Sequence, residues 1–341
     1  MTTIKEIADM AGVSRGTVDR VLHNRGPVRE ETADRVRQIA AALNYKPNRV
    51  GKVLVSRKKS LNIAFVVFRG ENPFFLDVLA GAKAKAVELM DMGISVTFYD
   101  TSIKDAEEQV RLLRELEEKG VNGVAITPID DPIVAEAIKT LSRHGIPVVT
   151  INTDIEGSGR MAYVGSDYYT SGRIASGLAN LITGGKAAIG IVNGSDSVRC
   201  HSQRVSGFID NCAARYPQLR VIDKCENLDD DLISYEETRR MLKAHPDMNL
   251  LYLSAAGVYG AVRALQSLNM DKKIKVISHD LIPTTIEAIK NNTITATIVQ
   301  QPKLQGSKPL DILSDYLLLN VTPTEELYLC ECGIRIFESV W

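Results

Sequence analysis

Two arginines near the N-terminus could bind nucleic acid. Arg15 and Arg20 lie between Ile4 and Leu22, a stretch whose apolar spacing predicts two short helices joined by a tight turn. Both arginines fall on the outward face of the second helix. A guanidinium group binds phosphate oxygens, and it also pairs bidentately with the O6 and N7 atoms of guanine. The spacing therefore predicts a helix-turn-helix that binds double-stranded DNA.

The turn between these helices carries the small residues that such a motif needs. Gly12 lets the backbone leave the first helix with a positive φ angle, and the Ser14 hydroxyl can cap the second helix. A simpler interpretation of the two arginines is that they lie in solvent or contact phosphates without reading bases. The residues alone leave both interpretations open.

A second set of chemical groups lies after apolar strands. Asn72, Phe74 and Phe75 follow the first apolar strand, and Asn152 and Thr153 stand at the end of the fourth. Aromatic rings cover the apolar face of a sugar ring, while short polar side chains bind its hydroxyls. The phenylalanines could equally be core residues at the start of a helix. The pattern thus favours a small polar ligand without excluding an ordinary core.

The elements that must position these groups are alternating strands and helices. From Leu61 onward, apolar strands alternate with amphipathic helices, which predicts the α/β class with doubly wound parallel sheets. There are about twice as many strands as one such sheet needs, so we expect two lobes facing a cleft. One helix is expected over 203–215, which leaves Arg199 and His201 in a loop at the mouth of that cleft.

A third helix and a linker separate the N-terminal motif from this body. The helix is amphipathic over 30–43, and Arg29 stands where a capping hydroxyl would help it start. Gly51 and several valines make the following segment a marginal helix. We therefore expect a helix-turn-helix domain over 1–46, a hinge segment over 47–60 and a two-lobed body over 61–341.

The charge is divided between these parts. Residues 1–60 hold thirteen Lys and Arg against six Asp and Glu, whereas the remaining residues hold twenty-eight against thirty-six. Only the first part attracts a polyanion. The five scattered cysteines are expected to be free thiols, and the chain shows no signal peptide or membrane-spanning run. These features predict a cytoplasmic protein with no membrane partner.

Motifs of catalysis are weak. The run GGK lacks the spacing of a phosphate-binding loop, the pair Cys330 and Cys332 is too short for a zinc site, and the five histidines form no triad. We therefore expect no enzyme activity, no catalytic residue, no metal and no cofactor. A sugar-modifying enzyme on this body has no supporting set of residues.

The quoted motifs resemble the lac-repressor (LacI/GalR) family along nearly the whole chain. IKEIADMAGVSRGTVDRVLHN and LNYKPNRV carry the N-terminal resemblance, and ENPFF, SDYYTSGRIA, RVSGF and ATIVQQP are similar to the ribose-binding branch of its effector domains. The resemblance implies a homodimeric transcription regulator, expected to be a repressor, whose operator affinity is controlled by a small sugar or polyol. It also implies a periplasmic-binding-protein-like body, with one lobe over 61–166 and 301–328 and the other over 167–300 and 329–341. A solute-binding protein without regulatory DNA binding is the alternative, and the basic N-terminal part argues against it.

The resemblance also implies DNA contacts. Leu54 matches a leucine that relatives insert into the minor groove, or it packs on the hinge of the second subunit. The expected DNA-binding residues are Thr3, Ser14, Arg15, Gly16, Thr17, Arg20, Asn24, Arg29, Asn48, Arg49 and Leu54.

Ligand contacts follow from the same resemblance. Arg204 matches an arginine that reaches sugar hydroxyls, Asp280 a carboxylate that accepts from two hydroxyls, and Gln300 an amide beside the hinge. Asn152 and Thr153 replace an Asp-Arg pair that is frequent in sugar-binding relatives. The expected ligand-binding residues are Asn72, Phe74, Phe75, Asn152, Thr153, Arg204, Ser254, Asp280 and Gln300.

Overall fold

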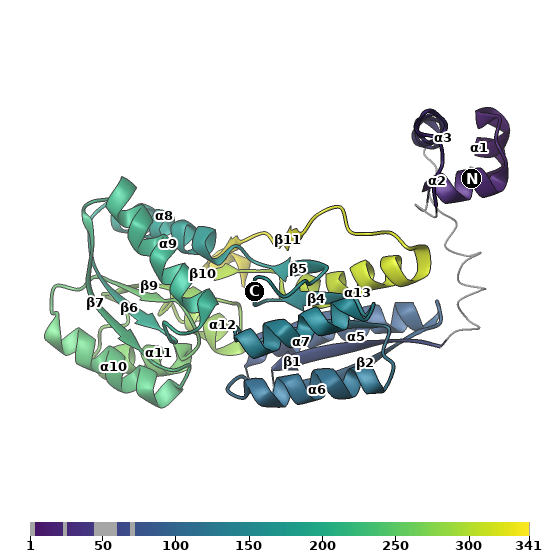
Figure 1. Ribbon diagram of the computed structural model, residues 1–341. Coiled ribbons are helices and arrows are strands. Elements are labelled where there is room, and N and C mark those ends of the chain that lie inside the picture. The colour runs from purple at the N-terminus through teal and green to yellow at the C-terminus, as the bar shows by residue number, and fades with distance from the viewer. Residues whose placement is uncertain (1–3, 23–25, 44–59, 69–71, 341) are drawn as a thin grey trace.

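The computed structural model (Figure 1) describes residues 4–22, 26–43, 60–68 and 72–340. The expected hinge segment lies outside these residues except for Ser60. Five of the expected DNA-binding residues also lie outside them, namely Thr3, Asn24, Asn48, Arg49 and Leu54.

The N-terminal domain is a three-helix unit. Its helices are α1 (Ile4–Ala11), α2 (Arg15–Leu22) and α3 (Glu30–Ala42). Ile7, Val18 and Val36, one from each helix, are fully buried against one another. The expected cap of α2 is present, because the Thr17 N–H donates to Ser14 Oγ at 3.1 Å. As expected from Arg29, no side chain caps α3.

The first lobe contains a six-stranded sheet. Its strands are β1 (Leu61–Phe68), β2 (Ile94–Thr101), β3 (Gly123–Ile126), β4 (Val148–Ile151), β5 (Ala162–Gly165) and β11 (Leu327–Leu329). They lie in the order β11-β5-β4-β3-β1-β2, and every neighbouring pair is parallel. The chain reverses its winding between β1 and β3, which is where such sheets place ligands, at the carboxyl ends of the strands.

Helices cover both faces of this sheet. They are α5 (Pro73–Met90), α6 (Ala106–Glu118), α7 (Pro132–Arg143) and α13 (Pro302–Leu319). Ile63 and Phe65 of β1 pack with α5 and α13, whereas Ala64 and Val66, which alternate with them, pack with α6 and α7. The two pairs of helices therefore lie on opposite faces.

The second lobe repeats the plan with one antiparallel pair. Its strands are β6 (Ala187–Asn193), β7 (Leu219–Glu226), β8 (Leu250–Leu253), β9 (Lys275–His279), β10 (Ala296–Val299) and β12 (Gly333–Arg335), in the order β12-β10-β9-β8-β6-β7. Only β10 and β12 are antiparallel. Its helices are α8 (Tyr168–Thr183) and α9 (Arg199–Arg215) on one face, and α10 (Asp231–Ala244), α11 (Val258–Ser267) and α12 (Pro283–Lys290) on the other.

The chain crosses between the lobes three times, after β5, after β10 and after β11. Figure 1 shows the result, in which α13 follows β10 of the second lobe but packs beside α5 in the first. Leu329, expected in the second lobe, instead pairs with Gly165 in the first sheet. The predicted α/β class with two lobes is confirmed. No described helix has the length and apolarity that a membrane crossing requires.

One expected helix begins earlier than its pattern indicated. Helix α9 starts at Arg199 rather than at residue 203, because the carbonyl of Val198 accepts from the N–H groups of His201 and Ser202. The expectation of a loop histidine was wrong, since His201 is buried within this helix. Val198 has no side chain that could cap the helix, so the usual start signal is absent at this boundary.

Candidate functional site

A cavity of about 270 Å³ lies between the two lobes. It is bounded by the segments that follow β1, β3 and β4 in the first lobe and β9 and β10 in the second, together with the start of α9. The carboxyl ends of strands from both sheets therefore meet at one space, as doubly wound sheets predict.

Aromatic rings form one side of the cavity. The Phe74 and Phe75 rings are 5.3 Å apart, the Phe68 and Phe75 rings are 5.8 Å apart, and both pairs meet edge to face. Asn72 fixes this corner, because its Oδ1 accepts from the Phe74 N–H at 3.0 Å and so caps α5. Phe74 also belongs to the core of the first lobe. Both interpretations of the phenylalanines therefore hold.

Arg204 is a buried cation on the opposite side. It reaches the cavity from α9 with 4% of its surface exposed. One terminal nitrogen donates to the Ser254 carbonyl at 2.8 Å, and the guanidinium lies 5.1 Å from the centroid of the Tyr168 ring. Within the described residues its Nε has no hydrogen-bond partner. A buried donor without an acceptor is costly, so this nitrogen is suited to a ligand oxygen.

Asp280 supplies a carboxylate near this arginine. Gln300 Nε2 donates to Asp280 Oδ1 at 2.8 Å, which leaves the second carboxylate oxygen for other donors. Burial raises the pKa of Asp280, although Arg204 and Gln300 act in the opposite direction. The pair Arg204 and Asp280 thus offers a donor and an acceptor to the same cavity.

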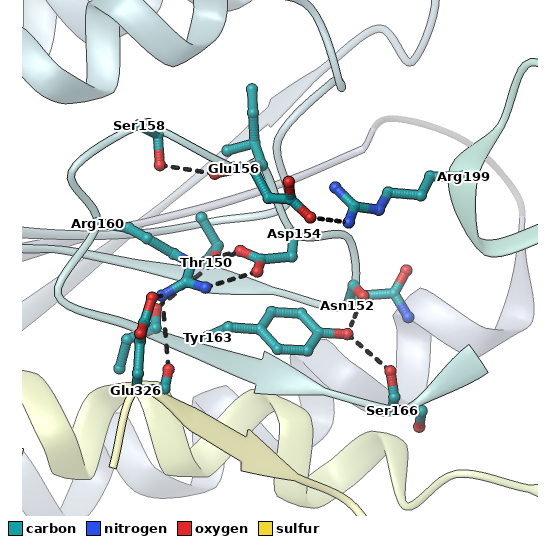
Figure 2. Close-up of polar contacts among 12 residues, drawn as sticks. Thr150, Asn152, Asp154, Glu156, Ser158, Arg160, Tyr163, Ser166, Arg199 and Glu326 are labelled. Atoms are coloured by element: carbon teal, nitrogen blue, oxygen red, sulfur yellow. Dashed lines mark hydrogen bonds and ion pairs between the residues drawn. The ribbon is translucent and has the colours of Figure 1, made fainter. Parts of the chain in front are cut away.

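The backbone at Asn152 is held by two tyrosines. The hydroxyls of Tyr163 and Tyr168 each donate to its carbonyl oxygen at 2.7 Å, and Tyr163 also donates to the Ser166 carbonyl (Figure 2). Asn152 has a φ angle of 61°, which asparagine tolerates better than most residues. Its amide Nδ2 donates to Gln305 Oε1 at 3.3 Å. This turn places Asn152 and Thr153 at the cavity surface.

The loop after this turn is fixed by a buried ion pair. Arg160 binds Asp154 through Nε and through a second nitrogen, 2.6 Å from Oδ2, and Thr150 donates to the same carboxylate (Figure 2). Arg160 also lies 3.2 Å from a carboxylate oxygen of Glu326. The network ties the loop after β4 to Thr150 of β4 and to Glu326, next to the lining residues Asn152 and Thr153.

Glu156 and Arg199 form an ion pair between the lobes (Figure 2). Glu156 belongs to the loop after β4, and Arg199 is the first residue of α9. Arg199 lines the cavity, so this contact joins the two lobes at its edge.

In the N-terminal domain, most of the described DNA-binding candidates are exposed residues on or just before α2. Ser14, Arg15, Gly16 and Arg20 are exposed, and Thr17 is half-buried. Arg20 Nε donates to the Gly16 carbonyl at 3.2 Å, so the side chain lies along the helix. Arg29 is exposed at the start of α3.

Known proteins resemble the chain in both parts. The ribose import binding protein RbsB of Bacillus subtilis is 28% identical over 261 residues, 76% of this chain and 83% of that protein. The ribose operon repressor of Halalkalibacterium halodurans is 26% identical over 292 residues, 83% of this chain and 81% of that protein. The crystal structure of GanP, a glucose-galactose binding protein from Geobacillus stearothermophilus, superposes with a TM-score of 0.75 at 27% identity, covering 83% of this chain and 99% of that one.

Two family models match. "Bacterial regulatory proteins, lacI family" matches residues 3–48, and "Periplasmic binding protein domain" matches residues 63–319, more than half of the chain. This chain is a lacI-family regulator with a periplasmic binding protein domain. The regulator therefore carries a DNA-binding domain and a two-lobed binding domain in one polypeptide, and the resemblance inferred from its sequence is confirmed.

The structure brings together all the expected ligand-binding residues of this regulator except one. Ser254 does not line the cavity, because its hydroxyl donates to Asn193 Oδ1 at 2.7 Å behind the wall. Its carbonyl instead positions Arg204. The residues that line the cavity as expected are Asn72, Phe74, Phe75, Asn152, Thr153, Arg204, Asp280 and Gln300.

Sequence reasoning missed several lining residues. Asp130 follows β3 and Asp229 follows β7, so the strand-end rule that found Asn152 could have found both. Tyr168, the first residue of α8, also lines the cavity and was not among the expected ligand-binding residues. His201 pairs weakly with Asp229, its Nε2 lying 3.8 Å from that carboxylate. Its Nδ1 accepts from the Ser195 N–H at 3.2 Å.

Proposed function

We propose that this regulator is a cytoplasmic, homodimeric repressor whose operator affinity is controlled by a small sugar or polyol bound between its lobes. The observation that carries the proposal is the cavity itself, which combines aromatic rings with a buried arginine and a carboxylate and belongs to a chain with a DNA-binding domain. No enzymatic step is part of the proposal.

The lining groups suit a polyhydroxylated ligand. Phe74 and Phe75 can cover the C–H face of a ring, while Arg204 Nε donates to one hydroxyl and Asp280 accepts from another. Thr153 and Asn152 add neutral groups in place of a charged pair. The relatives named above are a ribose import binding protein, a ribose operon repressor and a glucose-galactose binding protein, which supports a sugar of that size without choosing one.

A homodimer is supported by helix α5. Its exposed positions Leu76, Ala80, Lys83, Val87 and Met90 follow a four-three spacing along one face. Leu76, Val87 and Met90 are 61%, 66% and 70% exposed. Four apolar residues in five at this spacing are typical of a helix that packs against a second helix. We propose that α5 of each protomer contributes to the dimer, which would place two DNA-binding domains on one operator.

For the DNA interface, we propose that Arg15, Gly16 and Arg20 approach base edges, and that Ser14, Thr17 and Arg29 contact the backbone. Thr3, Asn24, Asn48, Arg49 and Leu54 remain proposals outside the described residues. The exposure of the start of α2 supports the first set.

The test has two arms on the full chain. Fragments selected from random-sequence DNA are compared with unselected DNA at matched salt, and selected DNA is expected to bind at least about 1000-fold more tightly. Thermal unfolding is then followed with D-ribose, D-arabinose, D-glucose, D-galactose, D-tagatose and common polyols. A sugar that raises the melting temperature with concentration should also change operator affinity. Equal affinity for selected and random DNA would refute sequence-specific operator binding. A sugar that stabilises the fold without altering operator affinity would refute the proposal that the sugar controls DNA binding.

A further inference from the structure

Gln305 is a fully buried polar residue just behind the ligand cavity. It lies in the first turns of α13, in the first lobe, and none of its surface is exposed. Its Oε1 accepts from Asn152 Nδ2 at 3.3 Å, on the first-lobe edge of the cavity. Its Nε2 donates to the Gln300 carbonyl at 2.8 Å, at the end of the second-lobe strand β10. One side-chain amide therefore joins cavity residues of both lobes.

Both partners of Gln305 are themselves tied to the cavity. Gln300 donates to Asp280 from its own side chain, and the carbonyl of Asn152 accepts from Tyr168, the first residue of α8 in the second lobe. Gln305 Nε2 also donates to Gln300 Oε1 at 3.4 Å, so a change in the distance between the lobes strains contacts of Gln305 with Asn152 on one side and with Gln300 on the other. Since Gln305 has no access to solvent, a broken contact would leave a buried amide without a partner. The Gln305 amide can therefore make its hydrogen bonds to Asn152 and to Gln300 at the same time only in one arrangement of the lobes.

Helix α13 is in turn fixed to α5 through backbone contact. A Cβ atom on Gly81 of α5 would overlap with the carbonyl of Lys303, and one on Gly306 of α13 would overlap with the carbonyl of Val78. The two helices therefore approach more closely than side chains would allow, on both sides of Gln305. A shift of α13 at this point must shift α5 with it.

We propose that Gln305 is a positioning residue that couples the arrangement of the lobes around the cavity to helix α5. The proposal rests on the regulatory function proposed above, because α5 carries the exposed face assigned there to the dimer. Ligand groups bound by Asp280 or by the Asn152 turn act on Gln305 through Gln300 and Asn152, and α13 passes the displacement to α5. Gln305 itself touches no ligand.

A double-mutant cycle on the ligand-free full chain tests this coupling. Glu156→Arg sets a second arginine against Arg199 at the edge of the cavity and so disfavours the arrangement of the lobes in which residues 156 and 199 are in contact. Gln305→Met removes all three side-chain hydrogen bonds at nearly unchanged side-chain volume. The measurement is hydrogen–deuterium exchange of the α5 amides, with the α6 and α7 amides on the opposite face of the sheet as the internal reference.

Gln109 provides a matched control. It is also fully buried in the first lobe, and its amide binds Thr101, the Thr127 carbonyl and the Ile129 N–H without reaching the second lobe. Gln109→Met therefore removes a comparable set of hydrogen bonds. The Gln109→Met variant shows how the loss of a buried glutamine affects amide exchange when that glutamine does not connect the lobes.

The expected result is that Glu156→Arg speeds α5 exchange about threefold in the wild type and in Gln109→Met, but adds nothing in Gln305→Met. Exchange in α6 and α7 stays unchanged by Glu156→Arg in all three. An equal effect of Glu156→Arg in Gln305→Met, or no effect on α5 in the wild type, would overturn the proposal. Because the assay contains neither sugar nor DNA, its failure is distinct from failure of sugar binding or operator selection.

Discussion

The two walls of the cavity differ in chemistry. The first-lobe wall (Phe68, Asn72, Phe74, Phe75, Ile103, Pro128, Ile129, Asp130, Asn152 and Thr153) is aromatic and mostly neutral, with Asp130 its one ionisable side chain among the described residues. The second-lobe wall holds Arg199, His201, Arg204, Asp229 and Asp280. One lobe therefore offers ring contacts and the other offers charged hydrogen-bonding groups, so a sugar makes both kinds of contact only when the lobes face each other.

The largest expected effect is on the second-lobe wall. Arg204→Ala removes the buried guanidinium and should weaken binding of the stabilising sugar about 100-fold, because charged hydrogen bonds are lost. Isothermal titration calorimetry measures the change. Arg215→Ala is the control, since Arg215 is exposed at the far end of the same helix. Unchanged sugar affinity in Arg204→Ala would show that Arg204 does not bind the sugar. It would also contradict the proposed difference between the two walls.

A smaller effect is expected on the first-lobe wall. Phe75→Ala removes a ring that is half-buried at the cavity and should weaken the same sugar about tenfold, through lost apolar contact. Phe98→Ala is the matched control, because Phe98 is half-buried in the same lobe and packs on Phe65 away from the cavity. Equal losses in the two variants would mean that Phe75 acts through stability alone.

The smallest effect concerns pH and the second lobe. Burial, followed by the charges of Arg204 and His201, holds the pKa of His279 well below its usual range. Below about pH 6.5, His279 is protonated in the unfolded chain but stays neutral in the folded chain. The free energy of unfolding therefore falls as the pH decreases. The melting temperature of wild type should drop a few degrees more between pH 7 and pH 5 than that of His279→Asn. Parallel curves for the two proteins would show that this histidine does not set the pH dependence.

The sequence predicted most of the elements because their patterns are local. Apolar runs such as LNIAFVVF give buried strands, and residues after them fall at the carboxyl edge of a parallel sheet. That rule placed Asn152 at the cavity edge, whereas Asp280 was expected from the family resemblance. The start of α9 was missed because Val198 offers no cap, and local patterns carry no other sign of that boundary.

Contacts that depend on tertiary geometry could not be predicted in the same way. Ser254 follows a strand just as Asn152 does, yet its hydroxyl donates to Asn193 and does not line the cavity. The order of the strands alone does not determine this side-chain orientation. Gln305 sits inside a helix pattern. The expected first lobe already included residues 301–328, but nothing in the spacing reveals that the Gln305 amide contacts both Asn152 and Gln300. Its role follows only from the way the chain crosses between the lobes.

Those three crossings mean that neither lobe is a contiguous piece of the polypeptide. A gene fragment that stops near residue 300 would lack α13 and β11, and with them one side of the first lobe. Producing a lobe alone would require splicing residues 61–165 to 302–329 through a designed turn. A single protease cut in one crossing would leave the two lobes covalently linked through the other two crossings. The nicked regulator should therefore still migrate as one particle under native conditions.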